Sequence, residues 1–338
     1  MAKKWAPDAI RLLNLGPTAS WRTQAVYHAT AEMMTADSRD TIILCQPLTP
    51  YLCLGYQQIF DSVLDRAECE RQNWPVVRRY LGGGTTYLDA NQLLFQCVFH
   101  HSRLPAVMDD LYALVLAAPV NALKRLGLNA RLRAMKEIAV DGQRIAHISG
   151  GRIGEATVIV GSLLFDFDYN ALAQAWRVPN EAFRDLASAA MRDRMTTIWR
   201  KSGPVNPEQV LWILLDELAK VLGRPIERGT PQQAETRHSQ QVAERITSAE
   251  YLNLHGDVYE NKVIPPMKSL KIAAGVYIRA AEAVHEGTPV YGSFRVREDV
   301  IEEARLRSEP ARDWQAVEAG LCGVAFSDWK DVLAKGGG

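Results

Sequence analysis

RRYLGGGTTYLD, residues 78–89, places three consecutive glycines between a β-type run at 75–79 and a second one at Tyr87. Glycines let the backbone approach a ligand closely and adopt positive φ. Their N–H groups, next to two arginines, suit a phosphate or a carboxylate. A P-loop needs a lysine after its last glycine, and a dinucleotide loop needs a following helix, so neither motif fits. The segment predicts an anion-binding loop, with an ordinary tight turn as the alternative.

Strand and helix patterns alternate outward from this loop. Asp141-Gly142, between two β-type runs at 137–140 and 143–148, is the strongest short hairpin signal. The pattern predicts an α/β domain with mixed sheets and flanking helices. Strands are expected at 10–15, 41–45, 51–54, 75–79, 93–100 and 157–166, and helices at 20–34, 63–73, 104–126 and from 169 to about 222.

A change in composition suggests how the chain is divided. Residues 223–241 are rich in Pro, Gly and Gln and poor in apolar side chains, which is typical of a linker. We therefore expect a first domain at 1–225, a linker at 226–242 and a small α+β domain at 243–338. In the last domain, strands are expected at 271–283 and 288–294, and a helix at 298–306.

The composition excludes several classes of protein. The 338 residues include 39 Lys+Arg and 39 Asp+Glu, and this balance argues against broad nucleic-acid binding. No run of 18 uncharged apolar residues is present, and the first residues lack a signal-peptide pattern. We expect a cytoplasmic protein with neither membrane nor nucleic-acid partners.

The cysteines and histidines do not predict a metal site. The five cysteines, none in a C-x-x-C pair, mostly lie in apolar runs, as expected for buried, reduced thiols. His100 and His101 are adjacent on an expected strand, so their side chains point to opposite faces. No metal ligand set is therefore expected among these residues.

The order of motifs resembles that of the lipoate–protein ligases, within the lipoate/biotin ligase superfamily. The glycine segment resembles their R-R-x-x-G-G-G-x-x-Y-x-D signature, and similar stretches precede and follow it in the same order. They are PYLCLGYQQ at 50–58, EIAVDGQRI at 137–145, VGSLLFD at 160–166, RMTTI at 194–198, and a C-terminal segment, 268–325, that resembles their small accessory domain. The resemblance thus covers nearly the whole chain.

This resemblance implies a fold and a reaction. The fold would be a mixed-sheet catalytic domain of the lipoate/biotin ligase type, followed by a small α+β accessory domain. Such enzymes use ATP and Mg²⁺ to activate lipoate or octanoate as acyl-AMP, and transfer the acyl group to a lysine of a lipoyl carrier protein. The accessory segment also resembles ligases of sulfur-oxidising prokaryotes, which modify a dedicated carrier.

Site residues follow from the same resemblance. Arg144 falls on the position of the family's active-site lysine and would be the catalytic residue. The residues expected to bind the nucleotide or acyl adenylate are Arg79, Gly82, Gly83, Gly84, Thr85, Thr86, Tyr87, Glu137, Gly161 and Ser162.

Three positions depart from the family pattern. Besides Arg144, Lys136-Glu137 replaces an Asn-Asp pair and Leu88 replaces a histidine. In a hairpin with a two-residue turn, Ala139 would face Arg144 and Glu137 would face Ala146. Glu137 and Arg144 would then share one face, with Lys136 on the other. Arg144 could bridge two oxyanions, although a guanidinium is larger and more planar than an ammonium.

Two other functions remain open. An ATP-independent octanoyl or lipoyl transferase would need a reactive cysteine, yet none occurs between Cys97 and Cys322. A non-catalytic binding module with a ligase-like scaffold would be consistent with the substitutions at 136, 137 and 144.

Overall fold

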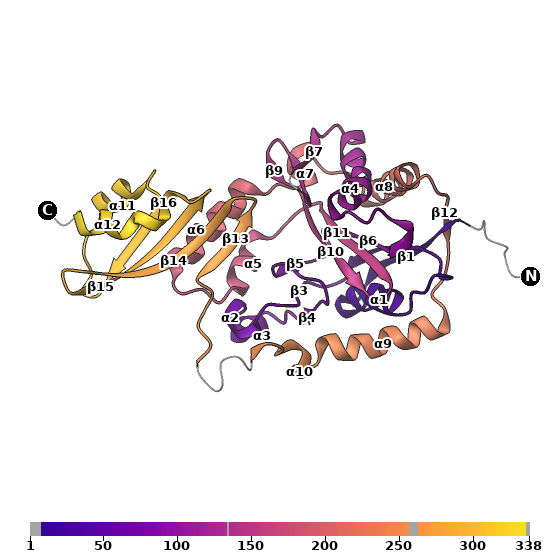
Figure 1. Cartoon of the computed structure of the whole chain (residues 1–338), viewed down its shortest axis with the longest axis horizontal. Coiled ribbons are helices and arrows are strands. Elements are labelled where there is room, and N and C mark those ends of the chain that lie inside the picture. The colour runs from indigo at the N-terminus through magenta and orange to yellow at the C-terminus, as the bar shows by residue number, and fades with distance from the viewer. Residues whose placement is uncertain (1–7, 134, 257–262, 336–338) are drawn as a thin grey trace, which may run out of the picture. The chain divides into compact units, whose positions relative to one another are not determined.

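The computed structural model describes residues 8–133, 135–256 and 263–335 and divides the chain into two compact units (Figure 1). The first unit consists of residues up to Phe60, Cys69–Asp168 and Met195–Val258. The second consists of Asp61–Glu68, Tyr169–Arg194 and the chain from Tyr259 onward. Both units are therefore discontinuous in sequence, unlike the expected domains at 1–225 and 243–338.

A six-stranded mixed sheet forms the centre of the first unit. Its order is β10-β11-β6-β2-β1-β12, in which β1 pairs in parallel with β2 and β12 while the other neighbours are antiparallel. The predicted α/β fold with mixed sheets is thus confirmed. The strands are β1 (Ile10–Thr18), β2 (Thr41–Pro47), β6 (Gln92–His100), β10 (Ala146–Ile153), β11 (Ala156–Leu164) and β12 (Ile226–Arg228).

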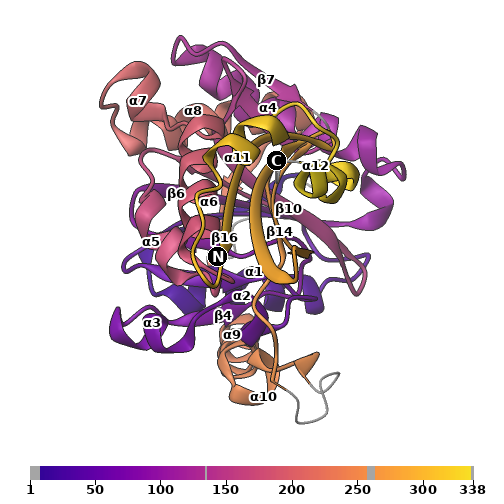
Figure 2. The same cartoon turned by 90° about the vertical axis from the view of Figure 1, so that its left-hand side faces the viewer.

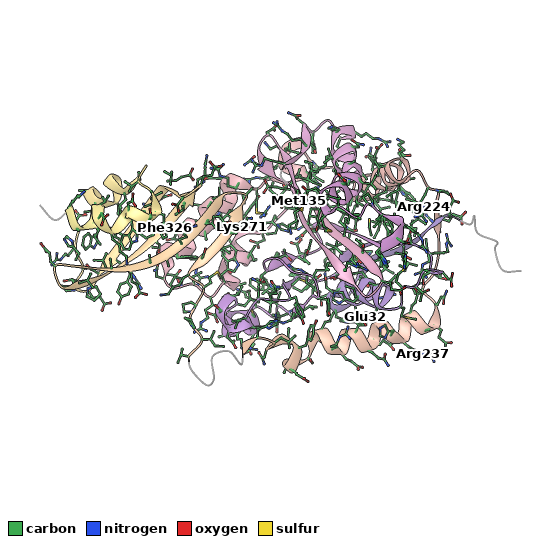
Figure 3. All side chains as sticks on the ribbon, in the orientation of Figure 1. Glu32, Met135, Arg224, Arg237, Lys271 and Phe326 are labelled. Atoms are coloured by element: carbon green, nitrogen blue, oxygen red, sulfur yellow. The ribbon has the colours of Figure 1, made fainter. Side chains whose placement is uncertain are left out.

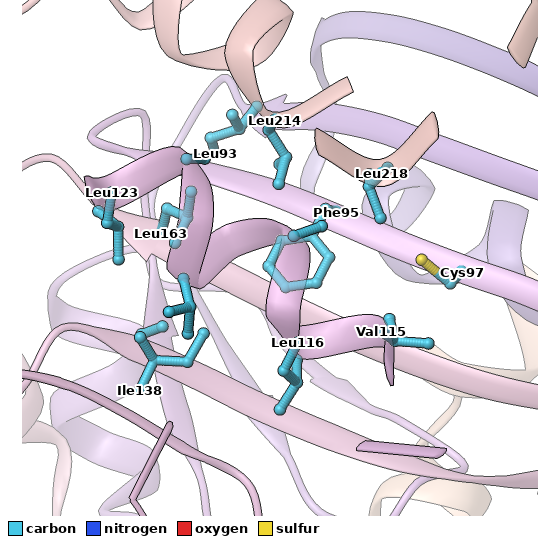
Figure 4. Close-up of a cluster of buried hydrophobic side chains, with 14 of the residues drawn as sticks. Leu93, Phe95, Cys97, Val115, Leu116, Leu123, Ile138, Leu163, Leu214 and Leu218 are labelled. Atoms are coloured by element: carbon cyan, nitrogen blue, oxygen red, sulfur yellow. The ribbon is translucent and has the colours of Figure 1, made fainter. Parts of the chain in front are cut away.

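Helices cover both faces of this sheet. On one face, α4 (Met108–Arg125) and α8 (Pro207–Leu222) bury leucines against Phe95 and its neighbours on β6 (Figure 4). On the other face, α1 (Ser20–Glu32) packs Val26 and Tyr27 against Val98 and Val158. Side chains of one strand alternate between these two cores, as the strand period requires. α7 (Ile198–Ser202) adds Ile198 to the first core.

The first unit also contains two separate three-stranded sheets. β4 (Val76–Arg78), β3 (Tyr51–Leu54) and β5 (Thr86–Leu88) form the sheet that holds the glycine segment, in the order β4-β3-β5. β7 (Ala130–Arg133), β8 (Glu137–Val140) and β9 (Gln143–Arg144) form the sheet that contains the predicted hairpin.

The expected linker at 226–242 is ordered secondary structure. β12 extends the large sheet beside β1, and α9 (Gln233–Thr247) packs Val242 and Ile246 against Ala25 and Ala29 of α1. Glu32 of α1 also accepts hydrogen bonds from His238 and Arg245 of α9 (Figure 3). Only a narrow stripe of α9 is buried, so its composition resembles that of a linker. A short helix, α10 (Ala249–Leu252), follows.

The second unit is built on an antiparallel sheet in the order β13-β14-β15-β16. The strands are β13 (Ser269–Ala273), β14 (Val276–His285), β15 (Thr288–Arg297) and β16 (Val300–Ser308). α11 (Gln315–Leu321) and α12 (Trp329–Lys335) lie on this sheet (Figure 2). The rings of Phe294 and Trp329 are in contact. α5 (Tyr169–Ala175) and α6 (Glu181–Arg194) complete the unit.

Several expected elements differ in detail. The helix expected at 298–306 is strand β16, because Glu298 and Asp299 adopt positive φ and turn the chain back along β15. The strand expected at 271–283 is interrupted at Gly275, whose φ is 73°. The helix expected at 63–73 is two short helices, α2 (Phe60–Val63) and α3 (Arg66–Arg71). Within the described ranges, no helix has the length and apolarity needed to cross a bilayer.

Candidate functional site

The glycine segment is a loop between β4 and β5, with Gly82, Gly83 and Gly84 all exposed. Gly83 has a φ of 102°, a conformation that favours glycine. Its carbonyl oxygen also lies against Gly55, where an added Cβ would come within 1.9 Å of it. The close approach of two backbone segments therefore requires glycine at position 55 and explains why the loop can fold back on β3.

Both arginines before the glycines bind backbone carbonyls. Arg79 donates from Nη1 to the carbonyl of Cys53 at 3.0 Å, and from Nη2 to those of Gly82 at 2.9 Å and Gly84 at 2.8 Å. The guanidinium of Arg79 thus stabilises the conformation of the glycine loop through its carbonyl groups. A direct role of Arg79 in binding a nucleotide remains a prediction.

Arg78 is fully buried and joins two other segments. Its Nη1 donates to the carbonyls of Gly55, Tyr56 and Gln58, and its Nη2 to those of Leu252 and Leu254. The first group belongs to the turn after β3, and the second to the end of α10. Arg78 is therefore a structural cation that ties α10 to the turn at 55–58.

Gln58 links this turn to the glycine loop. Its Oε1 accepts hydrogen bonds from the N–H of Gly55 and from the hydroxyl of Thr85, both at 2.9 Å. Tyr56 also donates its N–H to the carbonyl of Leu81. The G-x-x-Q stretch at 55–58 therefore acts as the support on which the glycine loop rests.

The residues after the glycines lie in a more buried environment. Thr86 pairs with Cys53 in the small sheet, and Tyr87 packs its ring edge-to-face against Trp74 and Phe167. Burial, followed by the nearby carboxylates of Asp89 and Asp168, raises the pKa of Tyr87. Its hydroxyl stays protonated at neutral pH and can donate a hydrogen bond.

The hairpin has the predicted register at its turn. Val140 faces Gln143 and Ala139 faces Arg144, with Asp141 and Gly142 both at positive φ. This geometry corresponds to the tight turn favoured by Asp-Gly. The pairing expected between Glu137 and Ala146 does not form, because the chain leaves the hairpin after Arg144. Ala146 pairs with Leu163 in the large sheet instead.

Arg144 and Glu137 each contact another side chain of the first unit. Arg144 lies beside Met195, with its Nη2 at 3.1 Å from the sulfur, and its carbonyl accepts the N–H of Thr196. Glu137 is buried and accepts hydrogen bonds from Nε and Nη2 of Arg133. Lys136 is exposed. The structure thus brings residues 195–196 of the predicted RMTTI motif next to Arg144.

One face of the large sheet carries a polar patch that includes the predicted residue Ser162 and also His147, which the sequence analysis missed. His147 lies directly opposite Ser162, and Ser149 opposite Val160, in the pairing of β10 with β11. Opposed residues of an antiparallel pair project from the same face. Ser149 also donates its hydroxyl to the carbonyl of Gly82 at 2.9 Å, which places this face beside the glycine loop. Polar residues at alternate positions of β10, His147 and Ser149, are the signal that could have identified it.

Charge near this patch is positive. Burial first, and then the cations of Arg144 and Arg79, lower the pKa of His147 to about 3. His147 is therefore a neutral imidazole at physiological pH. Two guanidinium groups close to neutral hydrogen-bonding side chains form an environment that stabilises an anion.

Gly161, a predicted adenylate-binding residue, has a packing role in this structure. An added Cβ would lie 2.3 Å from the ring of Phe95 on the neighbouring strand. Gly161 projects toward the core that contains α4 and α8, on the opposite face from Ser162. Any contribution of Gly161 to ligand binding would have to come from its backbone.

Four of the cysteines and two of the histidines have structural surroundings in this unit. Four of the cysteines are buried, and burial raises the pKa of Cys45 and Cys97 to about 12. Among residues 8–133, 135–256 and 263–335, no three His, Cys, Asp or Glu side chains cluster as a metal site would require. His100 and His101 bind Ser102 and the carbonyl of Glu155, respectively.

A separate pocket of about 520 Å³ opens between α1 and α9. Its walls include Leu13, Trp21, Leu48 and Ser239, and no residue of the glycine loop or of the hairpin lines it. This pocket is therefore distinct from the site described above.

Comparison with known proteins places this chain in a family. Residues 17–219, more than half of the chain, match the model of the lipoyl protein ligase A/B catalytic domain. Lipoate-protein ligase A subunit 1 of Thermoplasma acidophilum is 25% identical over 155 residues, which are 43% of this chain and 58% of that protein. The chain thus spans less than two thirds of that relative. Octanoyltransferase LipM of Kyrpidia tusciae is 24% identical over 270 residues, or 71% of this chain and 97% of that protein.

Solved structures share the fold. The bi-partite lipoate protein ligase of T. acidophilum, studied with its E2 lipoyl domain, superposes with a TM-score of 0.67 and 20% identity, over 74% of this chain and 98% of that one. A lipoate-protein ligase A bound with ATP superposes with a TM-score of 0.62 and 20% identity, over 72% and 98%. Both matches establish the fold of most of the chain.

Proposed function

Because the chain belongs to the lipoyl protein ligase A/B catalytic-domain family, whose members act on lipoyl or octanoyl groups, we propose that it is an ATP-dependent lipoate–protein ligase. It would activate lipoate or octanoate as acyl-AMP and transfer the acyl group to a lysine of a lipoyl carrier protein. The observation that carries this proposal is the position of Arg144 beside residues 195–196. The positive charges of Arg144 and Arg79 also act on His147, and both help to lower its pKa after burial.

The chemistry needs this distribution of charge. Activation brings a carboxylate against the α-phosphate, and two anions approach only where cations and N–H donors neutralise them. The carboxylate oxygen forms a bond to phosphorus while the bond to pyrophosphate breaks. Arg144 supplies a permanent positive charge that can contact two oxyanions at once. The exposed N–H groups of the glycine loop supply neutral donors for phosphate oxygens.

The nucleotide or the acyl adenylate would be held by the residues of the glycine loop and its neighbours. The set we propose is the predicted one: Arg79, Gly82, Gly83, Gly84, Thr85, Thr86, Tyr87, Glu137, Gly161 and Ser162, with Arg79 acting through the loop carbonyls and Gly161 through its backbone. Mg²⁺ would enter with the nucleotide, since it usually binds substrate phosphates rather than a protein cage.

The acceptor would be a folded lipoyl carrier domain. The T. acidophilum ligase, whose structure was studied together with an E2 lipoyl domain, supports this class of partner. A dedicated carrier of sulfur oxidation remains the narrower form of this proposal. A cytoplasmic location, without membrane or nucleic-acid partners, remains a prediction from the sequence.

Pyrophosphate release tests the proposal. Lipoate-dependent release from ATP and Mg²⁺ is expected in the wild type and should fall by about 10²–10³-fold in Arg144→Ala, the effect of removing a donor that stabilises developing charge. Arg144→Lys should retain part of the rate. Arg131→Ala is the matched control, because Arg131 is an exposed arginine of the same small sheet. A wild-type protein that releases no pyrophosphate, with or without a carrier, would refute ligase activity.

A second candidate function is ATP-independent octanoyl or lipoyl transfer. The match to an octanoyltransferase over nearly that protein's whole length favours it. Transfer through a cysteine would require an accessible thiolate, whereas Cys97 is buried with a raised pKa. Acyl transfer between carriers without ATP, abolished by thiol alkylation, would support this alternative. Nucleotide binding with neither reaction would support a binding module.

A further inference from the structure

His147, which is partly exposed, and Ser162, which is buried, form a pair of polar groups whose buried Nδ1 and hydroxyl have unused hydrogen-bonding capacity. They lie opposite each other on β10 and β11, and so project side by side from one sheet face. Ser162 is only 2% exposed, and neither its hydroxyl nor Nδ1 of His147 has a hydrogen-bond partner among the described residues. Buried polar atoms of this kind each cost about 1–3 kcal/mol when left unpaired, which points to a ligand as their partner.

The surroundings define what kind of ligand fits. The glycine loop borders this face through the hydrogen bond of Ser149 to Gly82. The ring of Phe167 meets the imidazole edge-to-face at 5.6 Å and supplies an apolar side. Arg144 and Arg79 are the cations whose charge reaches the imidazole. On the proposed function, an apolar ring beside two cations suits the carboxyl end of an acyl chain.

The state of the imidazole determines its chemistry. Since the two cations and burial keep it neutral, it presents one N–H donor and one acceptor across physiological pH. A neutral imidazole can polarise a carbonyl without giving up its proton. Arg144 cannot be deprotonated and serves as a fixed charge, so the two side chains have different roles.

We propose that His147 is a catalytic residue that donates a hydrogen bond to the acyl carbonyl oxygen of the substrate, with the hydroxyl of Ser162 as a second donor. This role rests on the proposed function. In the transfer step the lysine nitrogen forms a bond to the carbonyl carbon. The bond from that carbon to the phosphate oxygen breaks, AMP leaves with the electron pair, and the amine releases its proton to water. The hydrogen bond strengthens as negative charge grows on the carbonyl oxygen, and no proton is transferred from the imidazole.

The test compares His147→Ala and His147→Gln with the wild type. Formation of acyl-AMP is followed by lipoate-dependent pyrophosphate release, and transfer by single-turnover lipoylation of a carrier domain with ATP and Mg²⁺. We expect His147→Ala to lower the rate constant of transfer by about 10²–10³-fold, with KM for ATP changed less than about twofold. His147→Gln keeps a donor and should recover at least about tenfold. His101→Ala, an exposed histidine outside this face, is the matched control.

The pH profile separates a donor from a base. A neutral donor leaves the wild type and His147→Gln with the same dependence of transfer rate on pH. Transfer by His147→Ala within about threefold of the wild type would overturn the proposal. So would a pH profile of transfer in which the wild type shows an ionisation that is lost in His147→Gln while the transfer rate of that variant stays as low as that of His147→Ala. These results differ from failure of the ligase function itself, in which the wild type releases no pyrophosphate. Unchanged circular dichroism and thermal unfolding of both variants would exclude misfolding as the cause.

Discussion

Replacing Arg78 by methionine should release the turn at 55–58 from the end of α10. Arg78 has no exposed surface, and its hydrogen bonds to Tyr56, Gln58 and Leu252 are all 2.6 Å long. Those to Gly55 and Leu254 are longer, at 3.2 and 3.4 Å. Methionine keeps an unbranched apolar stem but is shorter and has no donor, so all these carbonyls would lose their partner.

The magnitude follows from the three short bonds. Each charged hydrogen bond contributes about 1.5–3 kcal/mol, and this gain is partly offset because the buried guanidinium loses its hydration. Removal of the side chain leaves the carbonyls of Tyr56, Gln58 and Leu252 without this donor, at about 1–3 kcal/mol for each carbonyl, and after the hydration offset we take a net loss of about 4 kcal/mol. At about 4 kcal/mol, the opening equilibrium of this region would change by roughly 10³-fold.

Amide hydrogen exchange measures this effect at the residues concerned. The amides of Tyr56, Gln58 and Leu252 are all hydrogen-bonded in the native state, and their protection should fall together in Arg78→Met. The control is Arg237→Met, which changes an exposed arginine of α9 (Figure 3) and should alter stability by less than about 0.5 kcal/mol. Equal protection in both variants would show that the buried guanidinium does not hold the two segments together.

Two further predictions concern the glycine loop and its support. Gly55→Ala should abolish nucleotide binding measured by calorimetry, because the added Cβ would meet the carbonyl of Gly83 at 1.9 Å. Gly82→Ala is the control and should still bind nucleotide, because the space around Gly82 is open. Equal affinities of the two variants for the nucleotide would contradict the predicted role of the loop. Acid should destabilise the protein through His28, whose pKa is lowered to about 3 by burial, then by Arg245 and Arg79. The unfolded state takes up the proton first, so stability is full above about pH 6.5 and falls by about 2 kcal/mol by pH 5. Denaturant unfolding across this range should show a weaker pH dependence in His28→Gln, and an unchanged dependence would refute this assignment.

The sequence predicts the fold where local chemistry and tertiary structure agree. Asp-Gly specifies its own turn, so the register around Asp141 follows from the sequence. α9 could not be predicted because its buried face is limited to Ser239, Val242 and Ile246, and the rest of it is polar. The strand at 300–308 carries helix-forming Glu and Arg residues, and only its pairing with β15 fixes it as a strand.

The elements that carry the candidate site could be predicted from the sequence, but the contacts of its side chains could not. The glycine triplet and Arg144 fall on their expected elements, since motif spacing reflects chain order. Whether an arginine binds a ligand or a carbonyl depends on segments distant in sequence, as the contact of Arg78 with Leu252 shows. His147 was missed because its importance arises from a strand pairing with Ser162 that no local pattern contains.

The discontinuity of the second unit has a consequence for biosynthesis. α6 buries Phe183, Leu186 and Met191 and contacts β13, β14 and β15, and Arg295 of β15 pairs with Asp193 of α6. β13 begins 75 residues after α6 ends. At a synthesis rate of roughly 5–20 residues per second, the apolar face of α6 stays uncovered for about 4–15 s before the ribosome begins to synthesise β13. A nascent chain arrested in this interval should therefore recruit chaperones, and a fragment cut at residue 225 should aggregate.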